Sequence, residues 1–446
     1  MDLIGMIPSF GNIIYTLGAF IVALSIIVAV HEYGHYIVGR WSGIHAEVFS
    51  LGFGPRLASW RDRRGTLWQI SLLPLGGYVK FLGDADAASS GADQGSLSGM
   101  SAAELRRTMH AAPLWARAAT VAAGPVFNFV LAVFVFAMVV GWQGQAVAPL
   151  TIERILPMPE TVQELRPGDV ITEIHGKDIS DLSQFNAVIS DLPKAPSLDY
   201  KIQRDGETLL VPGPFPYPPV VASVSPQSAA LAAGLEKGDY ILAIDGTPLG
   251  SFEDLRSAVM MSEGEALNLT IWRDGDEFPL SLTPKSVDYP SADGGFETRY
   301  MIGVAGDLFF EPVTEFPGPF TALKIGISQT GMIIEQSLSG LYHVLTGAIS
   351  SCNLQGPIGI AETSGAVASQ GLVDFIWFIG VLSAAVGLLN LFPVPVLDGG
   401  HLVFFGYEAI TGRPPNDKVL RVLMATGLAL ILSLMVFALS NDVFCP

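Results

Sequence analysis

Three residues of an apolar segment near the start of the chain have the types and spacing of a metal-dependent active site. They belong to the sequence His31-Glu32-Tyr33-Gly34-His35. Side chains four positions apart share one face of a helix, so the imidazoles of His31 and His35 can reach the same metal ion. Zinc peptidases place a glutamate directly after the first histidine as the general base. We therefore expect His31 and His35 to bind zinc and Glu32 to be the catalytic base.

This motif lies in a segment that is apolar enough to cross a membrane. Residues 13–30 carry no charge, and the first arginine of the chain is Arg40. A helix from residue 13 to residue 40 is about 40 Å long at 1.5 Å per residue, which exceeds the ~30 Å hydrocarbon core of a bilayer. Ionisable residues at this depth usually mark a functional site, although a helix end with interfacial histidines is an alternative. The sequence thus indicates hydrolysis close to a membrane surface.

The apolar runs of the chain indicate a polytopic α-helical membrane protein. Of its 446 residues, 50% are hydrophobic and 15% are charged, which is typical of a membrane protein with a substantial soluble part. We expect about four membrane-spanning helices. We expect the first within residues 1–43, the second at 118–142, and the third and fourth within 372–446, at about 372–391 and 419–439.

The distribution of charge predicts the orientation in the membrane. The net charge is −18, and residues 142–316 hold 27 acidic residues against 11 basic residues. Basic residues gather instead between the first two apolar runs, and such segments favour the cytoplasmic side. We therefore expect the acidic segment and both termini outside, and the active site near the cytoplasmic side. No basic patch is evident, so the sequence argues against nucleic acid as a partner.

Residues 44–83 change to a pattern that is typical of β-structure. Short β-like runs alternate with turn sequences rich in glycine and proline. We expect β-hairpins at or in the membrane face, whose unpaired edges could accept an extended peptide by strand addition. A purely structural hairpin is the alternative. Residues 84–117, glycine-rich and serine-rich around 85–100, are expected to form a cytoplasmic loop. The β-like runs are Ala46–Leu51, Leu57–Trp60, Thr66–Leu72 and Tyr78–Leu82.

The acidic segment contains an internal repeat. Residues 165–176 align with residues 235–246 at an offset of 70, and both copies hold a Gly-Asp pair followed by an apolar strand pattern. The pattern is similar to PDZ modules of bacterial envelope proteases, so we expect two extracytoplasmic PDZ domains, mainly β with some α, at 150–216 and 217–310. PDZ modules bind peptide ends by strand addition. Either copy could instead serve only as a spacer.

The segment after the acidic repeat is expected to be helical and amphipathic. Residues 317–350 have apolar residues at helical spacing, which predicts a helix along the membrane–water interface. Residues 356–359 are expected to form a further turn. Cys352 and Cys445 would both lie outside, where an oxidising compartment allows a disulfide between them, although two free cysteines are an alternative.

A catalytic zinc ion usually has three protein ligands, so the two histidines need a partner. Asp398 lies at the cytoplasmic end of the third apolar run, at the depth expected for the histidines. Pro393 and Pro395 break the helix just before it, and irregular backbone at membrane depth is tolerated where it lines a cavity. His401 could support a ligand from behind. We favour Asp398 over the other acidic residues of this region, Glu362, Asp374 and Glu408.

The combined motifs resemble the site-2 protease family of intramembrane zinc metalloproteases, in particular its members with tandem PDZ domains. The resemblance covers essentially the whole chain. The residues that carry it are HEYGH at 31–35, GFGP at 52–55, PLGGYVK at 74–80, GPVFN at 124–128 and NLFPVPVLDGGH at 390–401, together with the tandem repeat.

The resemblance implies a zinc metalloendopeptidase of the bacterial inner membrane, with one Zn²⁺ per chain and periplasmic PDZ domains. His31, His35 and Asp398 are implied as zinc ligands and Glu32 as the base. Asn390 and the β-region are implied to hold an unwound substrate. The implied substrate is a single-span membrane protein, an anti-sigma factor already trimmed outside, cut in regulated intramembrane proteolysis of an envelope stress response. The candidate substrate-binding residues are Asn390, Gly52, Phe53, Gly54, Gly76, Gly77 and Tyr78.

Two functions of other classes stay open at this point. Intramembrane histidine and aspartate ligands can also mark the ion pathway of a metal transporter. A scaffold without catalysis could use the PDZ pair alone to assemble envelope partners. Neither alternative needs Glu32 beside the two histidines, so replacement of this glutamate separates them from a protease.

Overall fold

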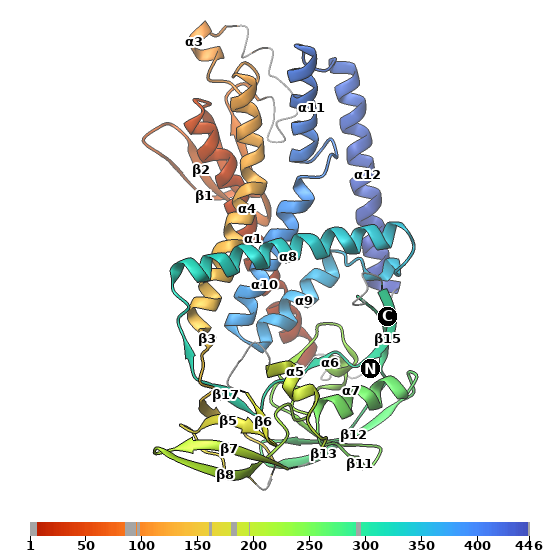
Figure 1. Ribbon diagram of the computed structural model, residues 1–446. Coiled ribbons are helices and arrows are strands. Elements are labelled where there is room, and N and C mark those ends of the chain that lie inside the picture. The colour runs from red at the N-terminus through yellow and green to blue at the C-terminus, as the bar shows by residue number, and fades with distance from the viewer. Residues whose placement is uncertain are drawn as a thin grey trace. The chain divides into compact units, whose positions relative to one another are not determined.

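The computed structural model describes residues 7–84, 95, 99–159, 163–179, 185–195, 197–290 and 296–444 (Figure 1). The chain divides into two compact units, and each is described here by itself. We call them the helical unit, Met1–Val139, Pro319–Gly347 and Ser351–Pro446, and the strand-rich unit, Val140–Gly318 and Ala348–Ser350.

Within the residues that the structure describes, four helices are long and apolar enough to cross a membrane, which confirms the predicted number. They lie in α1, α4, α10 and α12, which are labelled in Figure 1. The apolar windows of these helices bury between 6% and 44% of their residues inside the protein, so much apolar surface is left for lipid. The bounds are Ile7–Trp41 for α1, Leu114–Gln143 for α4, Leu372–Asn390 for α10 and Asp417–Phe444 for α12.

Helices α1 and α4 approach each other closely because glycines lie between them. A Cβ atom on Gly34 would be only 2.5 Å from the carbonyl oxygen of Ala123. Small residues at such positions let the backbones of membrane helices come together. Nearer the start of α1, Ala23 and Ile27 are fully buried and pack with Ile379 of α10. The face of α1 that carries His31 and His35 is therefore held against α4.

The β-region consists of two long strands, β1 (Ala46–Arg61) and β2 (Leu67–Phe81), rather than four short ones. Each long strand bends and enters the sheet twice. Residues 46–51 pair with residues 77–81 and also with residues 67–70, while residues 56–61 pair with residues 67–71. The predicted turn at Gly52 does not end the strand, because glycine with φ = +86° allows the bend inside it.

The helical unit also contains further helices. Helix α8 (Pro319–Leu345) crosses α4 and α10 in Figure 1, and Ile333 of α8 packs with Phe136 of α4. The turn predicted at 356–359 is wrong, because α9 (Pro357–Gln370) begins there with Gly356 as N-cap and proline at the first position. A proline at this position is favourable in a helix, since its missing N–H has no helical partner. The others are α3 (Ala102–Leu105) and α11 (Asp398–Thr411).

Two sequence predictions fall on residues that the structure does not describe. The loop predicted around 85–100 lies mostly outside the described residues. Cys352 is disulfide-bonded, whereas Cys445, the only other cysteine of the chain, lies outside the described residues.

The strand-rich unit contains two four-stranded sheets with matching strand order, β6-β5-β7-β8 and β11-β10-β12-β13. An arginine–aspartate ion pair occupies the same place in both, Arg204 with Asp169 and Arg273 with Asp239, and the two aspartates are buried. The strands of these sheets are β5 (Val170–Ile174), β6 (Lys177–Asp178), β7 (Leu198–Arg204), β8 (Glu207–Gly213), β10 (Tyr240–Ile244), β11 (Thr247–Pro248), β12 (Leu267–Arg273) and β13 (Asp276–Leu282).

Each sheet of the strand-rich unit has its own apolar core. One core surrounds the fully buried Tyr200, and the other surrounds Ile271. The unit also contains short helices and strand pairs. These are α5 (Phe185–Ser190), α6 (Ala229–Ala233), α7 (Phe252–Met261), β3 (Gln145–Ala146), β4 (Ile152–Ile155), β9 (Ser223–Val224), β14 (Lys285–Pro290), β15 (Phe296–Met301), β16 (Val304–Ala305), β17 (Phe310–Pro312) and β18 (Thr314–Glu315).

Candidate metal centre

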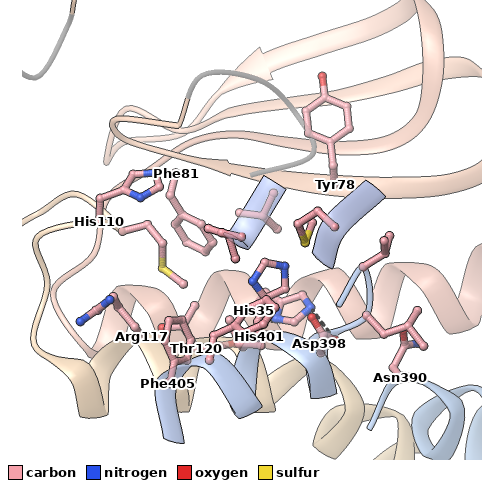
Figure 2. A pocket seen from close by; sticks show the side chains of 18 of the residues that line it. His35, Tyr78, Phe81, His110, Arg117, Thr120, Asn390, Asp398, His401 and Phe405 are labelled. Carbon is pink, nitrogen blue, oxygen red and sulfur yellow. Dashed lines mark hydrogen bonds and ion pairs between the residues drawn. The ribbon is translucent and has the colours of Figure 1, made fainter. Parts of the chain in front are cut away.

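The side chains of His31, His35 and Asp398 converge within the helical unit. The Nε2 atom of His31 lies 3.2 Å from Oδ2 of Asp398, and Nε2 of His35 lies 3.5 Å from the same oxygen. The two Nε2 atoms are 3.1 Å apart. Figure 2 shows His35 and Asp398 pointing toward each other from two different elements. The structure thus brings together two residues of α1 and one residue that lies more than 360 positions later.

Local sequence explains why Asp398 reaches this place. Helix α10 ends at Asn390, and α11 begins at Asp398 after an irregular segment that contains Pro393 and Pro395. Gly399 and Gly400 follow, and a Cβ atom on either would collide with the backbone of this segment. Prolines and glycines therefore fold the chain back on itself and leave the carboxylate in the first turn of α11.

Helix α4 supports both histidines from behind. Nδ1 of His35 lies 2.8 Å from the carbonyl oxygen of Thr120, and Nδ1 of His31 lies 3.2 Å from the side-chain amide of Asn128. Gly124 lies between these two supports, and a Cβ atom there would be 2.7 Å from Nε2 of His31. Gly124 and Asn128 belong to the GPVFN motif at 124–128, to which the sequence analysis gave no role at the metal centre, and Thr120 was not predicted.

Glu32 lines the same cavity as the three converging residues. The backbone amide of Val79 hydrogen-bonds its carboxylate, and a Cβ atom on Gly77 would be 3.1 Å from its Cγ. Residues 77–81 of β2 are thus the part of the sheet that lies next to the glutamate. The absence of a side chain at residue 77 leaves room for Glu32 at this contact.

The cavity has a volume of about 890 Å³ and is lined by α1, β2, α4, α11 and α12. Among the candidate substrate-binding residues, Gly77, Tyr78 and Asn390 line it. The ring of Tyr78 points away from Asp398 in Figure 2, and Gln69 donates a hydrogen bond to its hydroxyl. Tyr78 therefore lines the cavity through atoms other than its hydroxyl group. His401 also lines the cavity, one helical turn beyond Asp398.

The other four candidate substrate-binding residues are not among the residues that line this cavity. Phe53 is 43% exposed and stacks on the ring of Tyr78 at 6.1 Å between ring centroids. Gly76 lies under the Phe53 ring, where a Cβ atom would collide with it. Gly52 and Gly54 both have positive φ angles, +86° and +85°, in the bend of β1. These four residues shape the bend of the sheet rather than the cavity wall.

An ion pair between α4 and α11 borders the cavity and was not predicted. Nη2 of Arg117 lies 2.6 Å from Oε1 of Glu408, and Nη1 lies 3.1 Å from Oε2, so the pair is bidentate. Nε of Arg117 also donates to the carbonyl oxygen of Ala112. The two side chains are only 15% and 17% exposed. The pair joins α11, which carries Asp398, to the helix that supports both histidines.

The donor set and its surroundings fit a zinc ion. Two imidazole nitrogens and one carboxylate oxygen lie within 4.8 Å of one another. Oδ2 of Asp398 is buried without a hydrogen-bond partner, which is costly unless a cation or a proton donor occupies the space beside it. Catalytic zinc sites use three protein ligands of these types and keep one position open. The described residues therefore satisfy the requirements of such a site.

Comparisons with known proteins identify the family of the chain. The model of peptidase family M50 matches residues 19–434. The chain is 38% identical to an Agrobacterium fabrum protein provisionally named a zinc metalloprotease, covering 95% of this chain and 94% of the relative. It is 33% identical to the regulator of sigma-E protease of Salmonella typhimurium, covering 97% and 99%. The chain therefore belongs to peptidase family M50, the site-2 protease family, and its cofactor is zinc.

Proposed function

We propose that the chain is an intramembrane metalloendopeptidase that hydrolyses peptide bonds within or near transmembrane segments of single-span substrates. The observation that carries the proposal is the convergence of His31, His35 and Asp398 on one point, with Glu32 lining the same cavity. A metal transporter needs the three ligands but has no use for a general base beside them.

In this proposal the three converging residues hold the metal and Glu32 moves the proton. When bound, zinc supplies a Lewis acid that polarises the scissile carbonyl and lowers the pKa of water toward about 7. Glu32 accepts a proton from the attacking water and then donates it to the nitrogen of the leaving amine. The Val79 amide holds the carboxylate through its hydrogen bond, so the base keeps its orientation through the reaction.

We further propose that the β-region holds the substrate in an extended form. Peptide bonds of a membrane helix are hydrogen-bonded internally, so the helix must unwind before attack. Within the described residues, 77–81 pair with a neighbouring strand on one side only, and they lie next to Glu32. A substrate strand added to the other side would recover main-chain hydrogen bonds lost on unwinding. Asn390, at the opposite end of the sequence, lines the same cavity and is assigned a substrate contact.

The strand-rich unit is proposed to contain two periplasmic PDZ domains, at 150–216 and 217–310. Support comes from the matching strand order of its two sheets and from their equivalent arginine–aspartate pairs. The basic residues gather between the first two apolar runs, which favours the cytoplasmic side for that segment and the outer side for the strand-rich unit. The proposed active site is then near the cytoplasm. These domains would admit only substrates whose bulky outer part has been removed, and they could also bind peptide ends.

The substrate class we propose is a trimmed anti-sigma factor in an envelope stress response. Its support is the identity of 33% with a relative named regulator of sigma-E protease over nearly the full length of both chains. The proposal places the protein in the bacterial inner membrane as a multi-pass enzyme with one Zn²⁺ per chain. Four helices of sufficient length and apolarity agree with that location.

The test is co-expression with tagged single-span substrates, comparing the wild type with Glu32→Gln by immunoblot and measuring zinc in both purified proteins. Loss of the base should slow cleavage by about 10²- to 10⁴-fold while zinc still binds. Glu335→Gln, the same change at an exposed position of α8, is the control and should cleave normally. Unchanged cleavage by Glu32→Gln would contradict the proposal. If Glu32→Gln abolished zinc flux into vesicles without any effect on cleavage, the result would support a transporter.

A further inference from the structure

Asn128 is a buried amide whose side chain, among the described residues, contacts a histidine of the candidate metal centre. Its side chain is fully buried in α4, and Nδ2 lies 3.2 Å from Nδ1 of His31. Its Oδ1 atom is buried and has no hydrogen-bond partner. A buried carbonyl oxygen without a partner is rare because it forfeits the hydrogen bonds that water would supply. This arrangement therefore points to a second orientation of the amide.

The second orientation follows from what a neutral imidazole can do. One of its ring nitrogens carries a proton and the other carries a lone pair. Nε2 of His31 faces Asp398 at 3.2 Å and must offer its lone pair if it is to bind a metal. Its Nδ1 then carries the proton and needs an acceptor, which the NH₂ group of an amide cannot be. The Oδ1 atom of Asn128 is such an acceptor.

The neighbouring histidine shows the same requirement met by a group that can only accept. Nδ1 of His35 lies 2.8 Å from the backbone carbonyl oxygen of Thr120. That contact keeps the proton on Nδ1 and leaves the lone pair of Nε2 directed at Asp398. An amide that exchanges its oxygen and nitrogen keeps nearly the same shape, so Asn128 can supply the equivalent acceptor for His31 without other movement.

The position of Asn128 is fixed by the helices on both sides of it. Ser383 of α10 donates a hydrogen bond of 2.9 Å to the backbone oxygen of Asn128, and both residues are fully buried. A Cβ atom on Gly387 would be 3.2 Å from the Cβ of Asn128, so α10 packs closely against it. The amide is therefore held in place beside His31, and rotation about its last bond is the simplest change that pairs Oδ1.

We propose that Asn128 is the positioning residue of His31: with its amide rotated from the orientation seen here, Oδ1 accepts the proton of Nδ1 and directs the lone pair of Nε2 to the metal. The inference rests on the proposed role of His31 as a zinc ligand. It assigns to the buried asparagine of α4 a function in metal affinity rather than in helix packing alone. Residues that orient metal ligands in this way typically contribute 10- to 100-fold to affinity.

The test measures zinc affinity of the full-length protein in detergent by competition with a chromophoric chelator, for Asn128→Leu and Asn128→Asp. Leucine has a similar size but no acceptor, so its affinity should fall by about 10- to 100-fold. Aspartate can only accept, so it should keep at least the wild-type affinity. Asn441→Leu is the matched control, because this buried amide donates to Ser351 and Leu354 rather than to a metal ligand. Its affinity should not change.

The outcomes separate this inference from the proposed function. If His31→Ala lowers zinc affinity but Asn128→Leu does not, the positioning role is wrong and the zinc site stands. If His31→Ala also binds zinc as the wild type does, the site itself is wrong. If Asn128→Leu does not fold, Asn128→Asp decides: a folded aspartate variant with weakened zinc binding means that Asn128 donates to His31, which overturns the inference. Nitrogen-15 shifts of His31 in the zinc-loaded protein should show the proton on Nδ1 in the wild type and in Asn128→Asp.

Discussion

At the scale of single residues, the candidate metal centre depends on one position that has no side chain. Gly124 lies between the contacts that α4 makes with His31 and His35, and a Cβ atom there would be 2.7 Å from Nε2 of His31. Metal-ligating atoms must be held to within a fraction of an ångström. The space that glycine leaves is thus part of the site, although glycine contributes no donor atom to it.

We therefore expect Gly124→Ala to weaken zinc binding by roughly tenfold or more, on the scale measured for residues that orient metal ligands. The added methyl group must displace one of the two imidazoles. Chelator competition on the purified protein measures the effect. Gly18→Ala is the matched control, because it makes the same change in α1 where nothing lies within 4 Å of the new atom. Alanine favours helix more than glycine does, so neither change should weaken the helix that carries it. Equal zinc affinities in the two variants would refute the steric role.

The residues that approach the metal centre were largely predictable from the sequence, and those that support it were not. His31, His35 and Asp398 were named from residue type, spacing and expected depth, and the structure brings them together. Thr120 contributes a backbone carbonyl, which every residue has, so no residue type could reveal it. The partner of Asn128 depends on the rotation of α4 about its axis, which is set by packing against two other helices.

At the scale of elements, α11 carries Asp398 and is joined to α4 by the Arg117–Glu408 pair. The pair spans 291 positions of sequence, and an ion pair with such a separation has no local signal. Helix α9 was missed for a different reason. A Gly-Pro sequence can begin a helix as well as form a turn, and only the helical continuation after Pro357 distinguishes the two.

Glu408→Gln should destabilise the protein by about 3 kcal/mol, near the lower end of the range for breaking a buried ion pair, because it leaves Arg117 charged and poorly paired. Denaturant unfolding of the protein in detergent, followed by tryptophan fluorescence, measures the loss of stability. The double variant Arg117→Leu/Glu408→Leu removes both charges and should recover part of the stability. A single variant as stable as the wild type would show that the pair does not hold α11 in place.

At the scale of the whole molecule, the acidic strand-rich unit lies in the sequence between the two parts of the candidate metal centre. The apolar runs, the charge asymmetry and the repeat in this unit were all readable from composition and pattern. The two bends of the β-region were not, because a glycine within a strand pattern indicates a turn or a bulge equally well. The lengths of β1 and β2 are defined by how their residues pair across the sheet, which the sequence pattern does not reveal.

Deletion of residues 150–310 should allow cleavage of a single-span substrate whose outer domain is still intact. The proposed reason is that the strand-rich unit excludes bulky substrates from the cavity. Immunoblots of tagged trimmed and untrimmed substrates measure the selectivity. The deletion combined with Glu32→Gln should cut neither substrate, which excludes another protease as the source. Selectivity unchanged by the deletion would refute the filter.

The division of the proposed metal ligands between α1 and α11 has a consequence for biosynthesis. His31 and His35 are translated and inserted early, but Asp398 follows only after nearly nine-tenths of the 446 residues have been made. A nascent or prematurely terminated chain holds two of the proposed ligands and the proposed base without a complete centre, and two ligands do not make a catalytic zinc site. Hydrolytic competence therefore begins only when synthesis is almost complete, after the whole strand-rich unit has been produced.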